Sequence, residues 1–237
     1  MIRSFCLLIV SFFFSSGYSL TGIPLSKAEA ISLHVCEQDS LDKQILFNGR
    51  VWRNLYSNVR GDQFLFSGDF LKGTVTVNGK TYYNMNVKYD IYNDEILITT
   101  DRGIILQLNK EMTDEFAFEF NNREFVFRKM EPDVTTPLTG YVNNLVDGNL
   151  SLLVKYKKEI DPLSVENKYD SFGQSHRVYV RKDGKIYPIN FRKDFFNVLS
   201  DDKQQIRDFI KRERVRMTRK NPESYIPVTV FYNSLQR

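Results

Sequence analysis

Few residues of this chain have the types and spacing that catalysis requires. Histidine occurs only at His34 and His176, and the sequence contains no His-Glu-x-x-His, Cys-x-x-Cys or Gly-x-Ser-x-Gly motif. Ser175 directly precedes His176, but a nucleophile and its base must meet in space, beside a third group that orients the base. The sequence therefore predicts no catalytic residue, no metal site and no cofactor, and we expect a protein that is not an enzyme.

Carboxylate pairs are the one remaining source of hydrolytic chemistry. Two acidic side chains can hydrolyse a glycosidic bond when the surroundings keep one of them protonated. Candidates for such a pair are Asp62, Asp69, Asp90, Asp94 and Glu95. Asp90, Asp94 and Asp101 stand at turns and strand ends, so we expect them to be solvated turn residues. A secreted hydrolase with an unrecognised carboxylate site remains an alternative.

A basic run near the C-terminus is the strongest candidate for a binding surface. Residues 203–220 contain eight Lys and Arg against two acidic residues, and residues 176–237 carry a net charge of +8 (15 basic, 7 acidic). Such a cluster attracts an anionic partner. The expected contacts are Lys203, Arg207, Lys211, Arg212, Arg214, Arg216 and Arg219. Because an exported protein rarely meets nucleic acid, the expected partners are anionic lipid head groups, lipopolysaccharide or an acidic glycan. The alternative is a solvated helix face.

Aromatic residues are abundant, with 19 Phe and 13 Tyr. Those that alternate along the predicted strands are Phe64, Phe66, Phe116, Phe118, Phe120, Phe125 and Phe127. They could fill a core or line the cavity of a carrier for an apolar ligand, and we expect a core in which Phe118 and Phe127 are buried. Tyr82 and Tyr83 fall on opposite faces of one strand. An exposed row of tyrosines that includes Tyr89 or Tyr92 could stack on sugar rings.

The elements that must position these residues are mostly strands. Period-two alternation from about residue 64 to 129 predicts an antiparallel β-meander, and Asn78-Gly79 predicts a type I′ hairpin within it. A second β region includes a strand over residues 150–158 and a hairpin of residues 178–181 and 185–189 that turns at Asp183-Gly184. Residues 132–137, with a proline at each end, look like a connector.

The C-terminal residues change to a helical period. Phe191, Phe195, Val198 and Leu199 have helical spacing, Ser200 is expected to cap a second helix, and Ile206, Phe209 and Ile210 form its apolar stripe. Residues 222–235 are ambiguous between helix and strand. The sequence predicts an α+β fold in which an antiparallel meander, a curled sheet or partial barrel, is followed by a small C-terminal helical cap.

The N-terminal residues have the pattern of a secretory signal peptide. Arg3 precedes an apolar run over residues 5–14, and Gly17 and Ser19 are small residues at the expected cleavage positions. The run is shorter than the about 20 residues that a membrane-spanning helix needs. We expect cleavage after Ser19, with Ala30 as the alternative, export to the periplasm or cell surface, and no transmembrane segment in the mature chain.

These patterns divide the chain into five parts that make one compact unit after cleavage. They are a signal peptide (1–19), a flexible N-terminal segment (20–30), an antiparallel β region (31–131), a second β region (132–190) and C-terminal helices packed on the sheet (191–237). Cys36 is then the only cysteine of the mature chain, which excludes an internal disulfide. We expect Cys36 to be a small buried hydrophobic residue.

The hairpin block and the C-terminal block resemble an uncharacterised family of exported proteins from Bacteroidetes. The residues that carry the resemblance are 70–75, 78–83 and 87–95 in the first block and 192–196, 199–206 and 232–235 in the second. The resemblance implies export from a Gram-negative cell, and it supplies no activity or functional residue. Pro227 departs from the helical C-terminus of such relatives. We therefore expect a non-enzymatic binding or structural accessory protein of the periplasm or cell surface.

Overall fold

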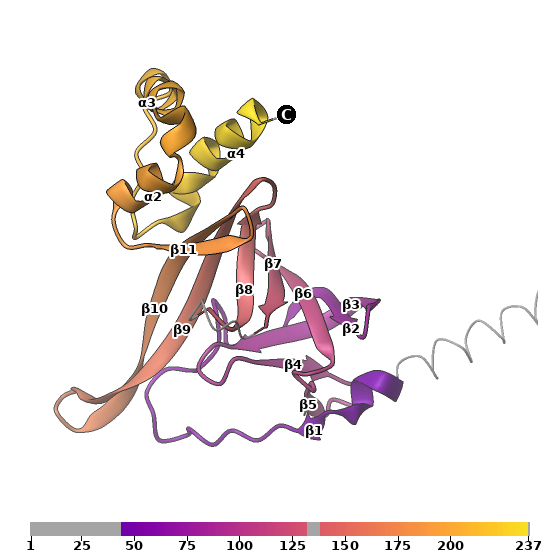
Figure 1. Ribbon diagram of the computed structural model, residues 1–237. Coiled ribbons are helices and arrows are strands. Elements are labelled where there is room, and N and C mark those ends of the chain that lie inside the picture. The colour runs from indigo at the N-terminus through magenta and orange to yellow at the C-terminus, as the bar shows by residue number, and fades with distance from the viewer. Residues whose placement is uncertain (1–43, 132–137, 237) are drawn as a thin grey trace, which may run out of the picture. The chain divides into compact units, whose positions relative to one another are not determined.

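One antiparallel sheet organises the protein. The computed structural model describes residues 44–131 and 138–236, so the predicted signal peptide, residues 20–30, His34, Cys36 and the 132–137 connector lie outside the described residues. The eleven strands follow the order β1-β5-β4-β3-β2-β6-β7-β8-β9-β10-β11, and the sheet does not close (Figure 1). The predicted fold class is confirmed: an antiparallel sheet followed by a small C-terminal helical region.

The strands differ widely in length. Their bounds are β1 Arg50–Val51, β2 Leu71–Val77, β3 Lys80–Asp90, β4 Glu95–Thr99, β5 Ile105–Gln107, β6 Thr113–Phe120, β7 Arg123–Met130, β8 Gly140–Val146, β9 Leu150–Val165, β10 Tyr169–Lys182 and β11 Lys185–Ile189. A 3₁₀ turn η1 (Gln44–Asn48) precedes them. Because β7 pairs with β8 across the 132–137 connector, the two predicted β regions are parts of the same sheet.

Tight turns fix the register of the hairpins. Asn78 and Gly79 have φ values of 48° and 75°, and Asp183 and Gly184 have values of 51° and 73°. Positive φ at both central residues is the mark of a type I′ turn, as the sequence predicted for β2–β3 and for β10–β11. The same geometry joins β6 to β7 at residues 121–122. Asn and Asp adopt it because their short side chains tolerate the left-handed region.

The sheet curls until strands far apart in its order meet in one core. β3 and β9 are not ladder neighbours, yet Tyr89 of β3 and Tyr156 of β9 belong to the same buried cluster. Lys158 of β9 also donates a backbone hydrogen bond to Ile91, just after β3 (3.3 Å). The curl therefore encloses the faces that carry the alternating apolar residues.

Aromatic rings fill this core. Phe118 and Phe127 are 2% and 0% exposed, so the prediction that both are buried is confirmed. The rings of Phe116 and Phe127 stack with centroids 4.8 Å apart, and Phe66 lies 4.6 Å from Phe125. These rings contact one another directly. Their packing supports the core over the ligand cavity of a carrier.

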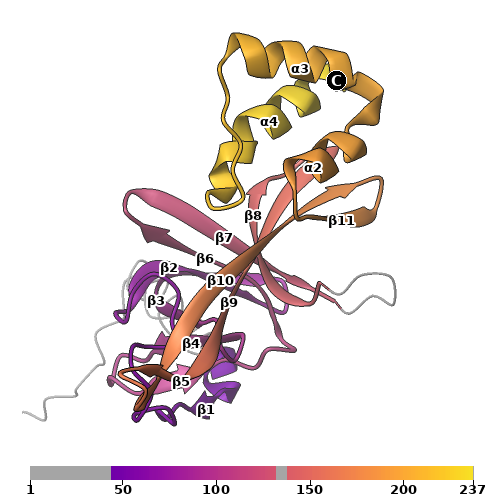
Figure 2. The same cartoon turned by 90° about the vertical axis from the view of Figure 1, so that its left-hand side faces the viewer.

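The C-terminal helices form a cap at one end of the sheet (Figure 2). Helix α2 (Arg192–Val198) packs on β11, α3 (Lys203–Arg212) on α4, and α4 (Ile226–Leu235) on β8 and β9. Asn233 ties α4 to β9, because its side-chain amide accepts from the Leu150 N–H (2.8 Å) and donates to the Leu150 carbonyl (2.9 Å). Together the cap and the strands bury a second apolar cluster.

The ambiguous residues 222–235 are helical. The 3₁₀ turn η3 (Pro222–Tyr225) leads into α4, and Pro227 lies in the first turn of that helix. A proline is tolerated there because a first-turn N–H has no partner within the helix. Ser200 belongs to the short 3₁₀ turn η2 (Ser200–Asp202), and α3 begins at Lys203. The predicted cap therefore falls before the helix rather than at its start.

The hairpin of β9 and β10 is far longer than predicted. The sequence indicated residues 150–158 and 178–181, but pairing continues to Val165 and Tyr169. The outer half carries polar and exposed side chains, so it lacks the apolar alternation that marks a half-buried strand. Residues 56–63 run along this half, and Arg60 forms a parallel bridge to Ser171. β8 was also missed, because its residues are largely buried and do not alternate.

Candidate functional site

The basic face lies on α3 and on the segment that follows it. Arg207, Lys211, Arg212, Arg214, Arg216 and Arg219 are exposed, and Lys203 is half-buried. Six of the seven predicted contact residues are thus fully available to a partner. Lys220, next to Arg219, is exposed as well. The structure therefore places these cations on one short stretch of the cap.

Buried residues attach the basic face to the rest of the cap. Ile206 and Ile210 are buried in the cluster between the helices and the strands, as their spacing predicted. Phe209 was expected to face the sheet and instead stacks on Phe231 of α4, with ring centroids 4.1 Å apart. The reason is the placement of α3, whose main packing partner is α4.

Most of these cations have no acidic partner among the described residues. Arg212 pairs with Glu213 (2.9 Å), and nearby Lys182 pairs with Asp201 (2.5 Å). The cations of the face that form no such ion pair are Lys203, Arg207, Lys211, Arg214, Arg216 and Arg219. A surface with this excess charge has a positive potential that extends into solvent.

Arg214 occupies a backbone conformation that an arginine rarely adopts. Its φ is 51°, in the left-handed region. It directly follows the last turn of α3, where the Val215 N–H bonds to the Ile210 carbonyl (3.1 Å). This hydrogen bond is the one that closes a Schellman motif, whose left-handed position is usually glycine. An arginine there costs stability, so the chain keeps a positive charge at a position where glycine would be more favourable.

His176 has a structural partner. Its Nε2 lies 2.8 Å from the Arg219 carbonyl oxygen, which fixes the segment after α3 against β10. Ser175 and His176 point to opposite faces of the strand because side chains alternate. The two residues therefore form no dyad.

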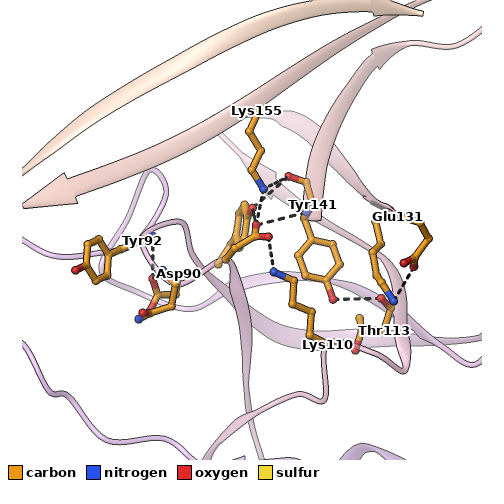
Figure 3. Close-up of polar contacts among 11 residues, drawn as sticks. Asp90, Tyr92, Lys110, Thr113, Glu131, Tyr141 and Lys155 are labelled. Atoms are coloured by element: carbon orange, nitrogen blue, oxygen red, sulfur yellow. Dashed lines mark hydrogen bonds and ion pairs between the residues drawn. The ribbon is translucent and has the colours of Figure 1, made fainter. Parts of the chain in front are cut away.

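The carboxylate of Asp94, in the β3–β4 turn, lies at the centre of a polar cluster that includes residues of β3, β8 and β9. It accepts hydrogen bonds from Tyr89 Oη (2.5 Å), Lys110 Nζ (2.5 Å) and Lys155 Nζ (2.7 Å). Lys155 also donates to the Tyr141 carbonyl (2.9 Å) (Figure 3). Burial alone would raise the pKa of Asp94, but Lys155 and Lys110 outweigh it and hold that pKa below its ordinary value. Burial lowers the pKa of Lys155, and Asp94 offsets part of this.

Asp90 is buried, and no cation among the described residues forms an ion pair with it. It accepts from the backbone N–H groups of Tyr92 (3.0 Å) and Asn93 (2.9 Å) and from the Asn93 side chain (2.9 Å). Burial raises the pKa of Asp90, and these hydrogen bonds offset part of the rise. The prediction that Asp90 and Asp94 are solvated turn residues is thus wrong, because the curl of the sheet covers the β3–β4 turn. Both carboxylates hold the fold together.

A shallow hollow beside Tyr83 was missed by sequence reasoning. It has a volume of about 480 Å³, and its lining includes Tyr83, Asn84, Glu119 and Glu124. Glu119 and Glu124 face each other across β6 and β7 with no cation paired to either among the described residues. Tyr82 is buried and Tyr83 is 71% exposed, as alternation predicted. Tyr89 is buried and Tyr92 half-buried, so the expected exposed row of tyrosines does not form with Tyr89.

In residues 44–131 and 138–236, no helix is both long and apolar enough to span a membrane. No group of three His, Cys, Asp or Glu side chains in the same residues is arranged to hold a metal ion.

Comparisons of the chain with protein-family models, with curated proteins and with solved structures gave no match.

Proposed function

We propose that this protein is an exported, non-enzymatic accessory protein that binds an anionic surface or polymer through the basic face of its C-terminal cap. The observation that carries the proposal is the set of exposed cations on α3 and the following segment that have no acidic partner among the described residues. A helix whose charges only keep it soluble usually carries both signs, which pair at spacings of three or four residues.

The conformation of Arg214 supports the same proposal. A left-handed arginine costs about 1–2 kcal/mol relative to glycine. Residues that break a local rule in this way are expected at functional sites.

The partner chemistry follows from the predicted export. Repeated phosphate or carboxylate groups outside the cytoplasm occur on anionic lipid head groups, on lipopolysaccharide and on acidic glycans. These sources share one recognition chemistry, in which arginine and lysine side chains bind anionic oxygens. Experiments with each material separate the sources.

Retention of the purified protein on each material tests the proposal. We would measure it on anionic liposomes, on lipopolysaccharide beads and on an acidic polysaccharide column, at about 0.01 M and about 0.15 M salt. The test variant carries Arg207→Glu, Lys211→Glu and Arg216→Glu. The matched control carries Arg53→Glu, Lys72→Glu and Arg102→Glu, three exposed cations of the β region that form no ion pair among the described residues. Both variants change the net charge equally.

The expected result is retention of the wild type and of the control on at least one material, with retention of the test variant lost. The attraction must also weaken with salt, because the Debye length shortens from about 30 Å at 0.01 M to about 8 Å at 0.15 M. Equal retention of both variants, or no retention of the wild type at low salt on any of the three materials, would refute the proposal.

A further inference from the structure

The outer edge of β10 is paired at both ends but open in the middle. β11 pairs with β10 from Val178 to Lys182, and Arg60 bridges to Ser171 nearer the hairpin tip. Between these two, residues 173–177 of β10 pair only with β9 among the described residues. Figure 1 shows β10 at the margin of the sheet, with β11 beside only one end of it.

The direction of the backbone groups in this gap follows from the hydrogen bonds between β10 and Arg60, next to the gap. The Asp170 carbonyl accepts from the Arg60 N–H (2.8 Å), and the Phe172 N–H donates to the Arg60 carbonyl (3.0 Å). Backbone groups of a strand alternate between its two neighbours. Gln174 and His176 therefore direct their N–H and C=O groups to the open side, in the same sense as Asp170 and Phe172.

A groove accompanies the open edge. Its volume is about 520 Å³, and its lining runs from Ser175 to Tyr179 on β10 and includes Asn190 and Arg219. Arg177 and Arg219 are both exposed and form no ion pair among the described residues. Arg177 projects on one face of the strand, and Arg219 lies over the other face, where His176 contacts its carbonyl. The open edge is thus flanked by a cation on each face.

We infer that residues 173–177 of β10 are a docking edge for an extended acidic peptide segment, which adds to the sheet as a further strand. Natural sheets cover or shorten their open edges because unpaired N–H and C=O groups recruit other strands. Here β11 and residues 56–63 cover the neighbouring stretches of β10 and leave a gap of strand length. An added strand satisfies the backbone groups of Gln174 and His176 and gives affinity, while side-chain positions on both faces give specificity.

Charge complementarity selects an acidic segment over a neutral one. A peptide strand sends alternate side chains to opposite faces, so acidic residues on either face reach Arg177 or Arg219. A glycan lacks the regular alternation of amide donors and carbonyl acceptors that this edge matches. The inference goes beyond the proposed function, since the anionic surface would meet α3 and the segment after it and the peptide would meet β10, with Arg219 common to both.

Fluorescence anisotropy with a labelled eight-residue peptide of alternating Thr and Glu tests the inference. The control peptide has the same sequence and charge but carries an N-methyl group at every residue, which removes the N–H groups from both of its edges. The protein variants are Gln174→Pro, which removes one edge donor, and Gln174→Thr, which keeps it. A proline is tolerated where an edge N–H faces solvent, and circular dichroism of both variants verifies the fold.

We expect the wild type and Gln174→Thr to bind the peptide alike. Gln174→Pro, or N-methylation of the peptide, should weaken binding about tenfold, as expected when one or two hydrogen bonds are lost. Amide hydrogen exchange at Gln174 and His176 should slow when the peptide is added. Because Gln174→Pro leaves α3 unchanged, its retention on anionic surfaces should remain that of the wild type, which separates this inference from the proposed function.

Three results would overturn the inference. Equal binding of the N-methylated peptide would mean that charge alone, and not backbone hydrogen bonding, holds the peptide. Absence of binding by the wild type at about 0.01 M salt, where electrostatic attraction is strongest, would mean that the edge does not accept a strand. Protection of Gln174 and His176 without peptide, together with a dimer in sedimentation, would assign the edge to a second copy of the chain.

Discussion

Gly140 lies so close to the carboxylate of Asp94 that a Cβ atom at position 140 would collide with Asp94 Oδ2. The Tyr141 N–H, one residue further along β8, also points at this carboxylate (3.4 Å). β8 can therefore begin here only because residue 140 has no side chain. The glycine and the aspartate, one on β8 and the other in the β3–β4 turn, together fix how the sheet curls.

Gly140→Ala should destabilise the protein more than a substitution at a comparable glycine. Gly140 and Gly184 have φ values of 75° and 73°, but a Cβ at Gly184 meets nothing within 4 Å. Gly184→Ala therefore carries only the backbone strain, roughly 1–2 kcal/mol. Urea unfolding of both variants isolates the collision with Asp94 as the difference. Equal losses in the two variants would contradict the packing described here.

Asp94→Asn should lower the free energy of unfolding by about 3 kcal/mol, because it leaves Lys155 partly buried without its counter-charge. Lys110 lies nearer the surface, with 41% of its side chain exposed. Lys110→Ala should accordingly cost less than 1 kcal/mol, as is usual for exposed pairs. Chemical denaturation at neutral pH measures both. A larger loss in Lys110→Ala than in Asp94→Asn would mean that Lys110, and not Lys155, is the main partner of Asp94.

The carboxylates of Asp90 and Asp94 should respond to pH in opposite directions. Asp94 has a lowered pKa in the folded protein, so its stabilising contribution is present above the ordinary value of 3.8 and is lost as pH falls through the folded pKa. Asp90 has a raised pKa, so its contribution is most favourable below 3.8 and declines as pH rises through the folded pKa. Unfolding free energies of Asp94→Asn and Asp90→Asn, each compared with the wild type across acidic pH, should therefore diverge. Parallel profiles would refute this assignment.

Arg214→Gly should stabilise the protein by about 1–2 kcal/mol, since glycine adopts the left-handed conformation without strain. The same change should weaken retention on anionic surfaces because it removes a cation. Arg214→Gln is the matched variant, which loses the charge but keeps the strain, so it should weaken retention without the gain in stability. If Arg214→Gly unfolds at the same denaturant concentration as the wild type, the strain described here is absent.

Glu119→Lys should stabilise the protein by about 0.2–1 kcal/mol, because it converts a like-charge pair across β6 and β7 into an opposite-charge pair with Glu124. Thermal unfolding at low salt measures the gain, which should shrink as salt screens it. Glu111→Lys, an exposed change of equal charge outside the strands, is the control. A gain of the same size in the control would trace the effect to net charge.

The sequence predicted those parts of the fold that depend on neighbours along the chain. Alternation placed Phe118 and Phe127 in the core, and Asn78-Gly79 specified its turn, because both signals act within a few residues. The contact between Asp94 and Lys155 could not be predicted, since the curl brings together strands that are not ladder partners. The outer half of the β9–β10 hairpin was not predicted, because its polar side chains lack the apolar alternation that indicates a strand. For the basic face, the sequence supplied the residues, and the fold added which of them lack an acidic partner.

The order of the strands also bears on how the chain folds. β2 through β5 pair with their sequence neighbours, as do β6 through β11, and the two meanders are joined where β2 pairs with β6. Local hairpins close quickly, whereas ladders between distant residues must first overcome the entropy of closing a long loop. We therefore predict that docking of β2 on β6, which joins the two meanders, is slower than closure of the hairpins. Mutations in that ladder should slow refolding, while mutations in the outer β9–β10 hairpin should mainly accelerate unfolding.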